Sequence, residues 1–200
     1  MNGENYSMIV LAGGKSSRMG RDKADLCLGN KTFLELQIEK GRRLGIQDIQ
    51  VSGYRGKRCP IPVTPDRIPE KGPLGGLESC LRRAKQEKCL VLGVDIPLIP
   101  VTELERLIEV SEKSEAKATI LKHGDRNEPL IAVYSRELAD GMVKEITQGK
   151  GSIFGLLDKT GYAVYESSAA KEYMTNANSY NEYSFVRDIF NKIGENDLFK

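Results

Sequence analysis

The stretch L-A-G-G-K-S-S-R-M-G-R-D-K at residues 11–23 joins a sharp turn to a group of cations, and it decides the fold around it. The residues before it, 7–11, are largely apolar and β-branched, which is typical of a buried parallel strand. Gly13 and Gly14 therefore fall at the carboxyl end of that strand, where the chain must turn. Glycine at such a turn lets backbone N–H groups approach an anion without a Cβ in the way.

The side chains that follow this turn supply positive charge. Arg18 offers a bidentate guanidinium and Lys23 a compact ammonium, and both suit the β- and γ-phosphates of a nucleotide. A Walker loop would need a glycine where the chain has Ile9, and Gly13-Gly14 cannot supply G-x-G-x-x-G. The stretch predicts a triphosphate site, and an ordinary turn that carries surface cations is the alternative.

Composition limits the classes of function. The 200 residues fit one domain, and 30 basic against 28 acidic residues give a net charge of +2, too balanced for a nucleic-acid partner. The four cysteines form no C-x-x-C pair and His123 is the only histidine, so a zinc site and a Ser-His-Asp triad both lack residues. Without a membrane span or a signal peptide, we expect a cytoplasmic protein with reduced cysteines and no membrane partner.

The alternation of apolar runs with helical stretches predicts an α/β fold in three layers, doubly wound, with a mainly parallel sheet. The expected strands are residues 8–11, 49–52, 90–94, 118–121 and 130–134. The polar segment 122–128 predicts a hairpin, which makes the second half of the sheet mixed. Capping boxes predict three helix starts, at Thr32 with Glu35, Thr102 with Glu105 and Ser179 with Glu182. We expect residues 196–200 to be a loose end.

Asp95 follows the apolar run 89–94, and Pro97 and Pro100 prevent an immediate helix. Ligands of open α/β sheets bind beyond the carboxyl ends of the strands, so this carboxylate should project into the binding crevice. A single hard oxygen ligand there suits Mg²⁺, which completes its shell with water and substrate phosphates. An aspartate that caps a turn without a metal is the alternative.

Residues 65–77, P-D-R-I-P-E-K-G-P-L-G-G-L, form a glycine- and proline-rich loop that enters a helix extending to about residue 85. Such a loop offers free N–H groups to a polar or anionic ligand. Asp66 could accept hydrogen bonds from N1–H and the exocyclic amine of guanine, or could lie in a surface loop without a ligand. Both interpretations stay open.

The signature at 11–23 resembles that of the molybdenum cofactor guanylyltransferases, and the likeness continues through G-P-L-G-G-L at 72–77, G-V-D-I-P-L at 93–98 and N-A-N-S at 176–179. Gly14 and Asp22 favour this branch over the related cytidylyltransferases, which usually carry A-A-G and proline there. The resemblance implies a nucleotide-diphospho-sugar-transferase-like fold. It implies transfer of GMP from GTP to the terminal phosphate of molybdopterin, with Mg²⁺ as cofactor and pyrophosphate as the second product.

The resemblance also implies residue roles. The N-terminal half would bind GTP and the C-terminal half molybdopterin, within one domain spanning residues 1–200. Asn176 and Asn178 would hold the second substrate or, alternatively, only form a turn before the last helix. The implied catalytic residues are Arg18, Lys23 and Asp95, with Asp95 as metal ligand, and the implied nucleotide-binding residues are Leu11, Ala12, Gly13, Gly14, Lys23, Asp66 and Asp95.

Two departures from the family pattern concern these roles. The segment 52–55 replaces an asparagine that many relatives carry near the base, and Tyr180 replaces a proline. The alternative functions are a cytidylyltransferase or other nucleotidyltransferase acting on a related acceptor, and a non-catalytic nucleotide-binding adaptor. We expect a monomer that contacts molybdoenzymes or their chaperones transiently.

Overall fold

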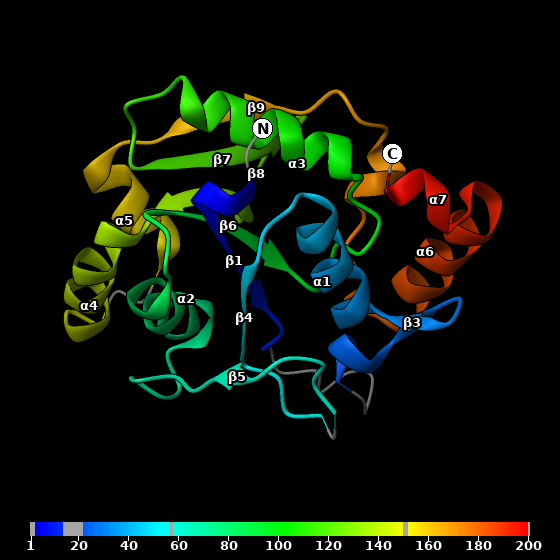
Figure 1. The fold of residues 1–200 in the computed structure, drawn as a ribbon, viewed down its shortest axis with the longest axis horizontal. Helices are drawn as coiled ribbons and strands as arrows, with labels where there is room; N and C mark the ends of the chain where they lie inside the picture. Colours follow the sequence, from blue (N-terminus) through cyan, green and yellow to red (C-terminus); the bar gives the residue numbers. More distant parts are fainter. Residues whose placement is uncertain (1–2, 14–21, 57, 150–151, 200) are drawn as a thin grey trace.

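The computed structural model describes residues 3–13, 22–56, 58–149 and 152–199. A seven-stranded sheet, in the order β5-β4-β1-β6-β8-β7-β9, carries helices on both faces (Figure 1). Its strands are β1 (Tyr6–Leu11), β4 (Asp48–Ser52), β5 (Val63–Thr64), β6 (Lys88–Gly93), β7 (Ala118–His123), β8 (Arg126–Ser135) and β9 (Ala163–Glu166). A separate hairpin pairs β2 (Cys27–Leu28) with β3 (Lys31–Thr32).

The helices of the described ranges complete the layers. They are α1 (Phe33–Arg43), α2 (Gly72–Arg83), α3 (Val101–Glu112), α4 (Ala139–Thr147), α5 (Ile153–Thr160), α6 (Tyr180–Ile193) and α7 (Glu195–Leu198), with 3-10 turns η1 (Gly3–Asn5), η2 (Lys23–Asp25), η3 (Arg136–Leu138) and η4 (Lys171–Met174). None of these helices has the length and apolar character of a membrane span. The α/β class and the single domain are confirmed.

The sheet is mainly parallel, as the alternating pattern predicts. β1 pairs in parallel with β4 on one side and β6 on the other, so strand order reverses at β1. β8 runs antiparallel to β6 and β7, which confirms the hairpin and the mixed second half. Leu11 pairs with both Ser52 and Gly93, so the carboxyl ends of the three strands at the reversal lie in one row.

Side chains alternate between the two faces of the sheet and bury two cores. Met8 and Val10 of β1 pack in the core with α1 and α3, whereas Ile9 and Leu11 pack in the core with α2, α4 and α5. Figure 1 shows α2, α4 and α5 grouped on one side of the sheet. β1 is buried along its whole length, so the strand before the glycine turn is rigidly held.

Two of the three expected helix starts are confirmed, and one of them has the complete capping box. Thr32 Oγ1 accepts from the N–H of Glu35 at 3.1 Å and the Glu35 carboxylate accepts from the N–H of Thr32 at 2.7 Å. Ser179 caps α6 by accepting from the N–H of Glu182 at 3.3 Å, but the Glu182 carboxylate accepts from the N–H of Asn178 and not from that of Ser179, so the box is incomplete. The start predicted at Thr102 is wrong.

α3 begins two residues earlier than that prediction, with Pro100 at the N-cap. The extended backbone of this proline leads directly into the helix, and Val101 and Leu104 are both buried in the core. The apolar residues fix the start of α3, so Thr102 lies inside its first turn.

The expectation of a loose C-terminal end is also wrong. α7 covers most of that segment, and Leu198 is fully buried with α6 and the β2–β3 hairpin. Lys31 forms an ion pair with Glu195 at 2.6 Å and also lies over the Phe199 ring, 5.4 Å from its centroid. The C-terminal helices therefore pack against the hairpin that leads into α1, as Figure 1 shows.

Candidate active site

The chain passes very close to itself at the ends of β1 and β4. The Ala12 N–H donates to the carbonyl of Ser52 at 2.8 Å, which continues the pairing one residue beyond the strand. A Cβ built on Gly53 would lie 2.5 Å from the Cα of Gly13, and Gly53 has a φ of +76°. Only glycine at position 53 allows this approach.

A small cavity of about 60 Å³ lies at this point. It is lined by Leu11, Gly13, Ser52, Gly53, Asp66, Gly72, Pro73 and Gly76. The Ser52 hydroxyl donates to Asp66 at 2.9 Å, so the predicted base-reading carboxylate faces the ends of β1 and β4. Gly14 and Arg18 lie outside the described residues, so the rest of the predicted phosphate turn has no structural account.

The glycines of the 72–77 motif lie inside α2 and not in a loop before it. A Cβ on Gly76 would lie 2.4 Å from the Ser52 hydroxyl oxygen, and a Cβ on Gly75 would lie 2.8 Å from the carbonyl oxygen of Ile68. The two glycines therefore let the first turns of α2 pack against β4 and the Asp66 segment. The expectation of a long glycine loop is corrected, because Gly72 and Pro73 already start the helix.

A buried ion pair holds the Asp66 segment on α2. Glu78 is fully buried and accepts from Arg67 at 2.9 Å and also from Arg82. The Arg67 N–H donates to the Ser79 hydroxyl at 2.8 Å. Because the residue next to Asp66 is fixed to α2 through both its backbone and its side chain, Asp66 has a defined position at the mouth of the small cavity.

Asp95 lies two residues beyond β6, where the sequence places it. The Val94 N–H donates to the carbonyl of Leu11 at 3.1 Å, which keeps this segment beside the end of β1. A Cβ on Gly93 would lie 2.7 Å from Oδ1 of Asp95, so glycine at 93 leaves room for the carboxylate. Burial raises the pKa of the Asp95 carboxyl, and Lys23 and Arg126 oppose that rise.

The residues around Asp95 fit one kind of Mg²⁺ site, in which the protein supplies few of the ligands. Among the described residues, no group of three or more His, Cys, Asp or Glu side chains gathers to hold a metal. One hard carboxylate oxygen, in a partly exposed position, suits an ion that takes its other ligands from water and substrate phosphates. An all-protein metal site does not fit these residues.

Lys23 and Asn178 touch each other although 155 residues separate them. The Lys23 ammonium donates to the side-chain oxygen of Asn178. Asn178 is held in turn, because its N–H donates to the Glu182 carboxylate at 2.8 Å at the start of α6. The sequence assigns Lys23 to the nucleotide and Asn178 to the second substrate, and the structure brings the two together.

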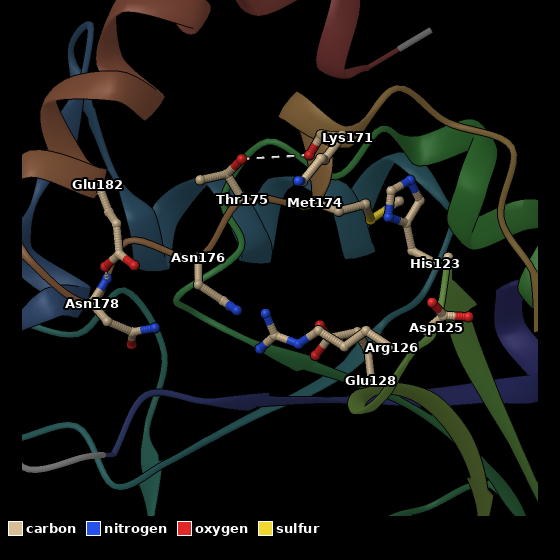
Figure 2. Close-up of a pocket in the computed structure, with 11 residues that line it drawn as sticks. His123, Asp125, Arg126, Glu128, Lys171, Met174, Thr175, Asn176, Asn178 and Glu182 are labelled. Atoms are coloured by element: carbon tan, nitrogen blue, oxygen red, sulfur yellow. Dashed lines mark hydrogen bonds and ion pairs between the residues drawn. The ribbon is translucent and has the colours of Figure 1, made fainter.

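A larger cavity of about 680 Å³ has Asn178, the partner of Lys23, in its wall. Figure 2 shows side chains of the β7–β8 hairpin and of the 171–182 segment facing each other across it. The cavity is lined by His123, Gly124, Asp125, Arg126, Glu128, Lys171, Met174, Thr175, Asn176, Asn178 and Glu182. The Ala177 N–H donates to the carbonyl of Asp95 at 2.8 Å, so this wall is tied directly to the aspartate's own backbone.

Arg126 is the central cation of this cavity. Its guanidinium pairs with Glu128 at 2.7 Å, and the Asn176 amide, turned with its oxygen toward Arg126, accepts from it at 2.7 and 3.2 Å. His123 lies nearby, with Nε2 3.1 Å from the carbonyl of Ala169. Burial raises the pKa of Glu128, while Arg126 lowers it.

Sequence reasoning misses His123, Arg126, Glu128 and Lys171. It treats the polar run 122–128 only as a turn. The useful signal is the direction of β7, because a strand parallel to β6 must end at the same edge as Asp95. That direction follows from the strand order and not from local sequence.

Comparison with known proteins agrees with this geometry. Residues 8–160 match the model of the MobA-like NTP transferase domain. A protein of Carboxydothermus hydrogenoformans named "Probable molybdenum cofactor guanylyltransferase" is 30% identical over 194 residues, 94% of this chain and 98% of that protein. The "Molybdenum cofactor guanylyltransferase" of Syntrophotalea carbinolica is 36% identical over 155 residues, 76% of this chain and 73% of that protein.

Solved structures give the same result. Molybdopterin-guanine dinucleotide biosynthesis protein A of Archaeoglobus fulgidus superposes with a TM-score of 0.80 at 26% identity, over 94% of this chain and 100% of that one. A cytidylyltransferase of Thermus thermophilus shares the fold alone, with a TM-score of 0.69 at 14% identity over 92% of this chain and 98% of that one. The chain therefore belongs to the molybdenum cofactor guanylyltransferase family, whose common unit is the MobA-like NTP transferase domain.

Proposed function

We propose that this protein transfers GMP from GTP to the terminal phosphate of molybdopterin, forming molybdopterin guanine dinucleotide and releasing pyrophosphate. The observation that carries the proposal is the contact of Lys23 with Asn178 in the wall of the large cavity, together with the electrostatic influence of Lys23 on the Asp95 carboxyl. The strand order places the end of β6 between β1, which borders the small cavity, and the β7–β8 hairpin, which borders the large one. Two substrates bound in these cavities would meet at Asp95.

The reaction needs positioning and charge more than a nucleophilic side chain. An ionised oxygen of the acceptor phosphate attacks the α-phosphorus of GTP, the bond from that phosphorus toward the β-phosphate breaks, and the electron pair leaves with pyrophosphate. Because the acceptor is already ionised at neutral pH, no general base is required. Arg18 and Lys23 neutralise charge on the triphosphate and on the leaving pyrophosphate.

Asp95 would hold Mg²⁺. The bound ion would supply positive charge between the phosphates of the two substrates. Burial raises the pKa of this carboxyl and the neighbouring cations lower it. The net effect is a rise, so the group is a weaker acid than a solvated aspartate. Lys23, in contact with Asn178, would reach toward both substrates from the same position.

The large cavity suits an anionic acceptor rich in nitrogen and oxygen. Arg126 and Lys171 supply positive charge beside three carboxylates, and the imidazole and the two asparagine amides can both donate and accept hydrogen bonds. The carboxylates are those of Asp125, Glu128 and Glu182. A pterin with a terminal phosphate has the matching groups. On this proposal the GTP site would lie in the N-terminal half of the chain and the molybdopterin site in the C-terminal half.

Guanine would be read in the small cavity by Asp66. Its carboxylate can accept from N1–H and from the exocyclic amine, a pair of donors that cytosine and adenine lack. The hydrogen bond from Ser52 shows that Asp66 already acts as an acceptor at this place. Leu11, Ala12, Gly13 and Gly14 would line the nucleotide beside it.

The proposal also covers the cellular compartment, the oligomeric state and the protein partners of the enzyme. Burial raises the pKa of the Cys80 and Cys89 thiols to about 12, and all four cysteines are free, which supports a reducing cytoplasm. We also propose that the chain works as a monomer and hands its product to molybdoenzymes or their chaperones by transient contact.

Pyrophosphate release tests the proposed function. Purified protein with Mg²⁺ and molybdopterin would be given GTP, CTP, ATP or UTP in turn, with a control that lacks the acceptor. Release that requires molybdopterin and is fastest with GTP would support the proposal. Faster release with CTP would favour a cytidylyltransferase, and nucleotide binding without release from any donor would favour an adaptor.

A further inference from the structure

Two polar residues occupy the buried face of α1. Gln37 and Lys40 have no exposed surface, although their neighbours Leu34, Leu36 and Ile38 are apolar core residues. Burying a lysine amine or an amide costs free energy unless hydrogen bonds compensate it. A leucine at either place would avoid that cost, so the contacts of the two side chains need an explanation.

Both side chains donate hydrogen bonds to backbone carbonyls of the segment 93–97, and Lys40 also donates to Gln37. Gln37 Nε2 donates to the carbonyl of Gly93 at 2.9 Å and to the carbonyl of Ile96 at 3.0 Å. Lys40 Nζ donates to the carbonyl of Pro97 at 2.6 Å and to Oε1 of Gln37 at 3.0 Å. Lys40 thus fixes the amide of Gln37, and Gln37 bridges the carbonyls on both sides of Asp95.

The segment they hold is also anchored by the N–H of Val94, which donates to the carbonyl of Leu11, and by the burial of Val94 and Ile96 in the core. Residues 94–97 lie between β6 and α3, and Pro97 has no N–H of its own to donate. The carbonyl of Asp95 accepts from the N–H of Ala177 in the wall of the large cavity. Donors from α1 and from this wall therefore act together with the core packing to fix the backbone on both sides of Asp95.

The same helix is tied to the segment that carries Lys23. The N–H of Phe33, the first residue of α1, donates to the carbonyl of Leu26 at 2.8 Å, just after η2. One element thus contacts the backbone on both sides of the proposed active site. A shift of α1 would move Asp95 and Lys23 relative to each other.

We infer that Gln37 and Lys40 are positioning residues that hold the Asp95 carboxylate in place for metal and phosphate. The inference rests on the proposed function, because it assigns the pair to the site where the two substrates would meet. Neither residue touches a substrate. Each acts through the backbone of residues 93–97, in the way that outer hydrogen bonds orient a metal ligand.

The test compares Gln37→Met and Lys40→Met with Lys88→Met. Lys88 is a matched control, because its ammonium also donates to a backbone carbonyl, that of Ser111 at 2.8 Å, but from the opposite end of β6. Each variant is measured for thermal unfolding, for binding of Mn²⁺ in the presence of GTP by electron paramagnetic resonance, and for kcat and acceptor KM.

We expect both α1 variants to bind Mn²⁺ about tenfold more weakly and to lose about tenfold in kcat, which is the usual effect of removing a hydrogen bond behind a metal ligand. The acceptor KM should stay within about threefold, since the large cavity keeps its lining. Lys88→Met should lose stability without a change in Mn²⁺ binding. If wild-type protein binds no Mn²⁺ with GTP, the proposed metal role of Asp95 fails, and this inference fails with it.

Suppose that the wild-type protein binds Mn²⁺ and that both α1 variants keep its Mn²⁺ affinity and kcat within a factor of about two. That result would overturn this inference but leave the proposed function standing. Gln37→Met keeps the bond from Lys40 to Pro97, so it provides the test if Lys40→Met does not fold. Loss of folding in both variants would assign the pair to stability only and would also overturn the inference.

Discussion

At the scale of single residues, Asp95 is the side chain on which the proposed chemistry depends most. Asp95→Ala should lower the rate of pyrophosphate release at least ~100-fold, because it removes the metal ligand and the charge stabilisation that depends on it. The thermal unfolding midpoint should change little, because Asp95 is only partly buried. The raised pKa of its carboxyl also indicates that the charged form is not stabilised by folding. Asp158→Ala, on the exposed side of α5, is the control. Activity that survives at saturating Mg²⁺ would remove Asp95 from the site.

The second prediction at this scale concerns the role of Lys23 in binding and turnover of GTP. Lys23→Ala should weaken GTP binding and lower kcat together, because the ammonium would meet charge in the ground state and extra charge on departing pyrophosphate. A lost hydrogen bond to a charged group costs about 1.5–3 kcal/mol. Isothermal titration and steady-state rates would measure both effects, with the exposed Lys113→Ala at the end of α3 as control. If affinity and rate both stay near wild type, Lys23 does not contact the nucleotide.

At the scale of elements, the buried lysine of α1 predicts how the stability of the fold depends on pH. Burial lowers the pKa of Lys40 to about 7, below its ordinary value of 10.5. Between these two pH values the unfolded chain holds the proton and the folded chain does not, so the free energy of unfolding rises with pH, by up to about 1.4 kcal/mol per pH unit. Urea unfolding of wild type and Lys40→Met between about pH 7.5 and about pH 9.5 should show a difference that grows in favour of wild type. A difference independent of pH would contradict the burial of a neutral lysine.

Sequence patterns predict the elements well where the signal is local. The strand before Gly13 and the helix starts at Thr32 and Ser179 depend on neighbouring residues, and all of them form, although only Thr32 has a complete capping box. The start of α3 differs because core packing of Val101 decides it, and α7 differs because burial of Leu198 orders a short polar segment. β5 has only two residues and β9 is only partly buried, so neither shows a strong apolar pattern. The contact between Lys23 and Asn178 depends on strand order, which no local pattern contains.

At the scale of the whole molecule, the reversal of strand order at β1 explains why one domain can hold two substrates. β1 and β4 end at the small cavity, while the β7–β8 hairpin and the segment before α6 enclose the large one. Asp66 belongs to the first side only. Asp66→Asn should therefore reduce the preference for GTP over CTP more than it slows the reaction, because the phosphate and metal contacts remain. An equal loss of rate with both nucleotides would place Asp66 outside base recognition.

The most direct test of GMP transfer is a competition between nucleotides. Wild-type protein with Mg²⁺ and molybdopterin would receive equal concentrations of GTP and CTP, and mass spectrometry would quantify the products. The proposed function predicts that GMP joined to molybdopterin through a new pyrophosphate linkage exceeds the cytidine product by ~10²-fold or more, since a site that pairs with one base edge rejects the other. Recovery of unchanged molybdopterin, or a product that carries mainly CMP, would contradict it.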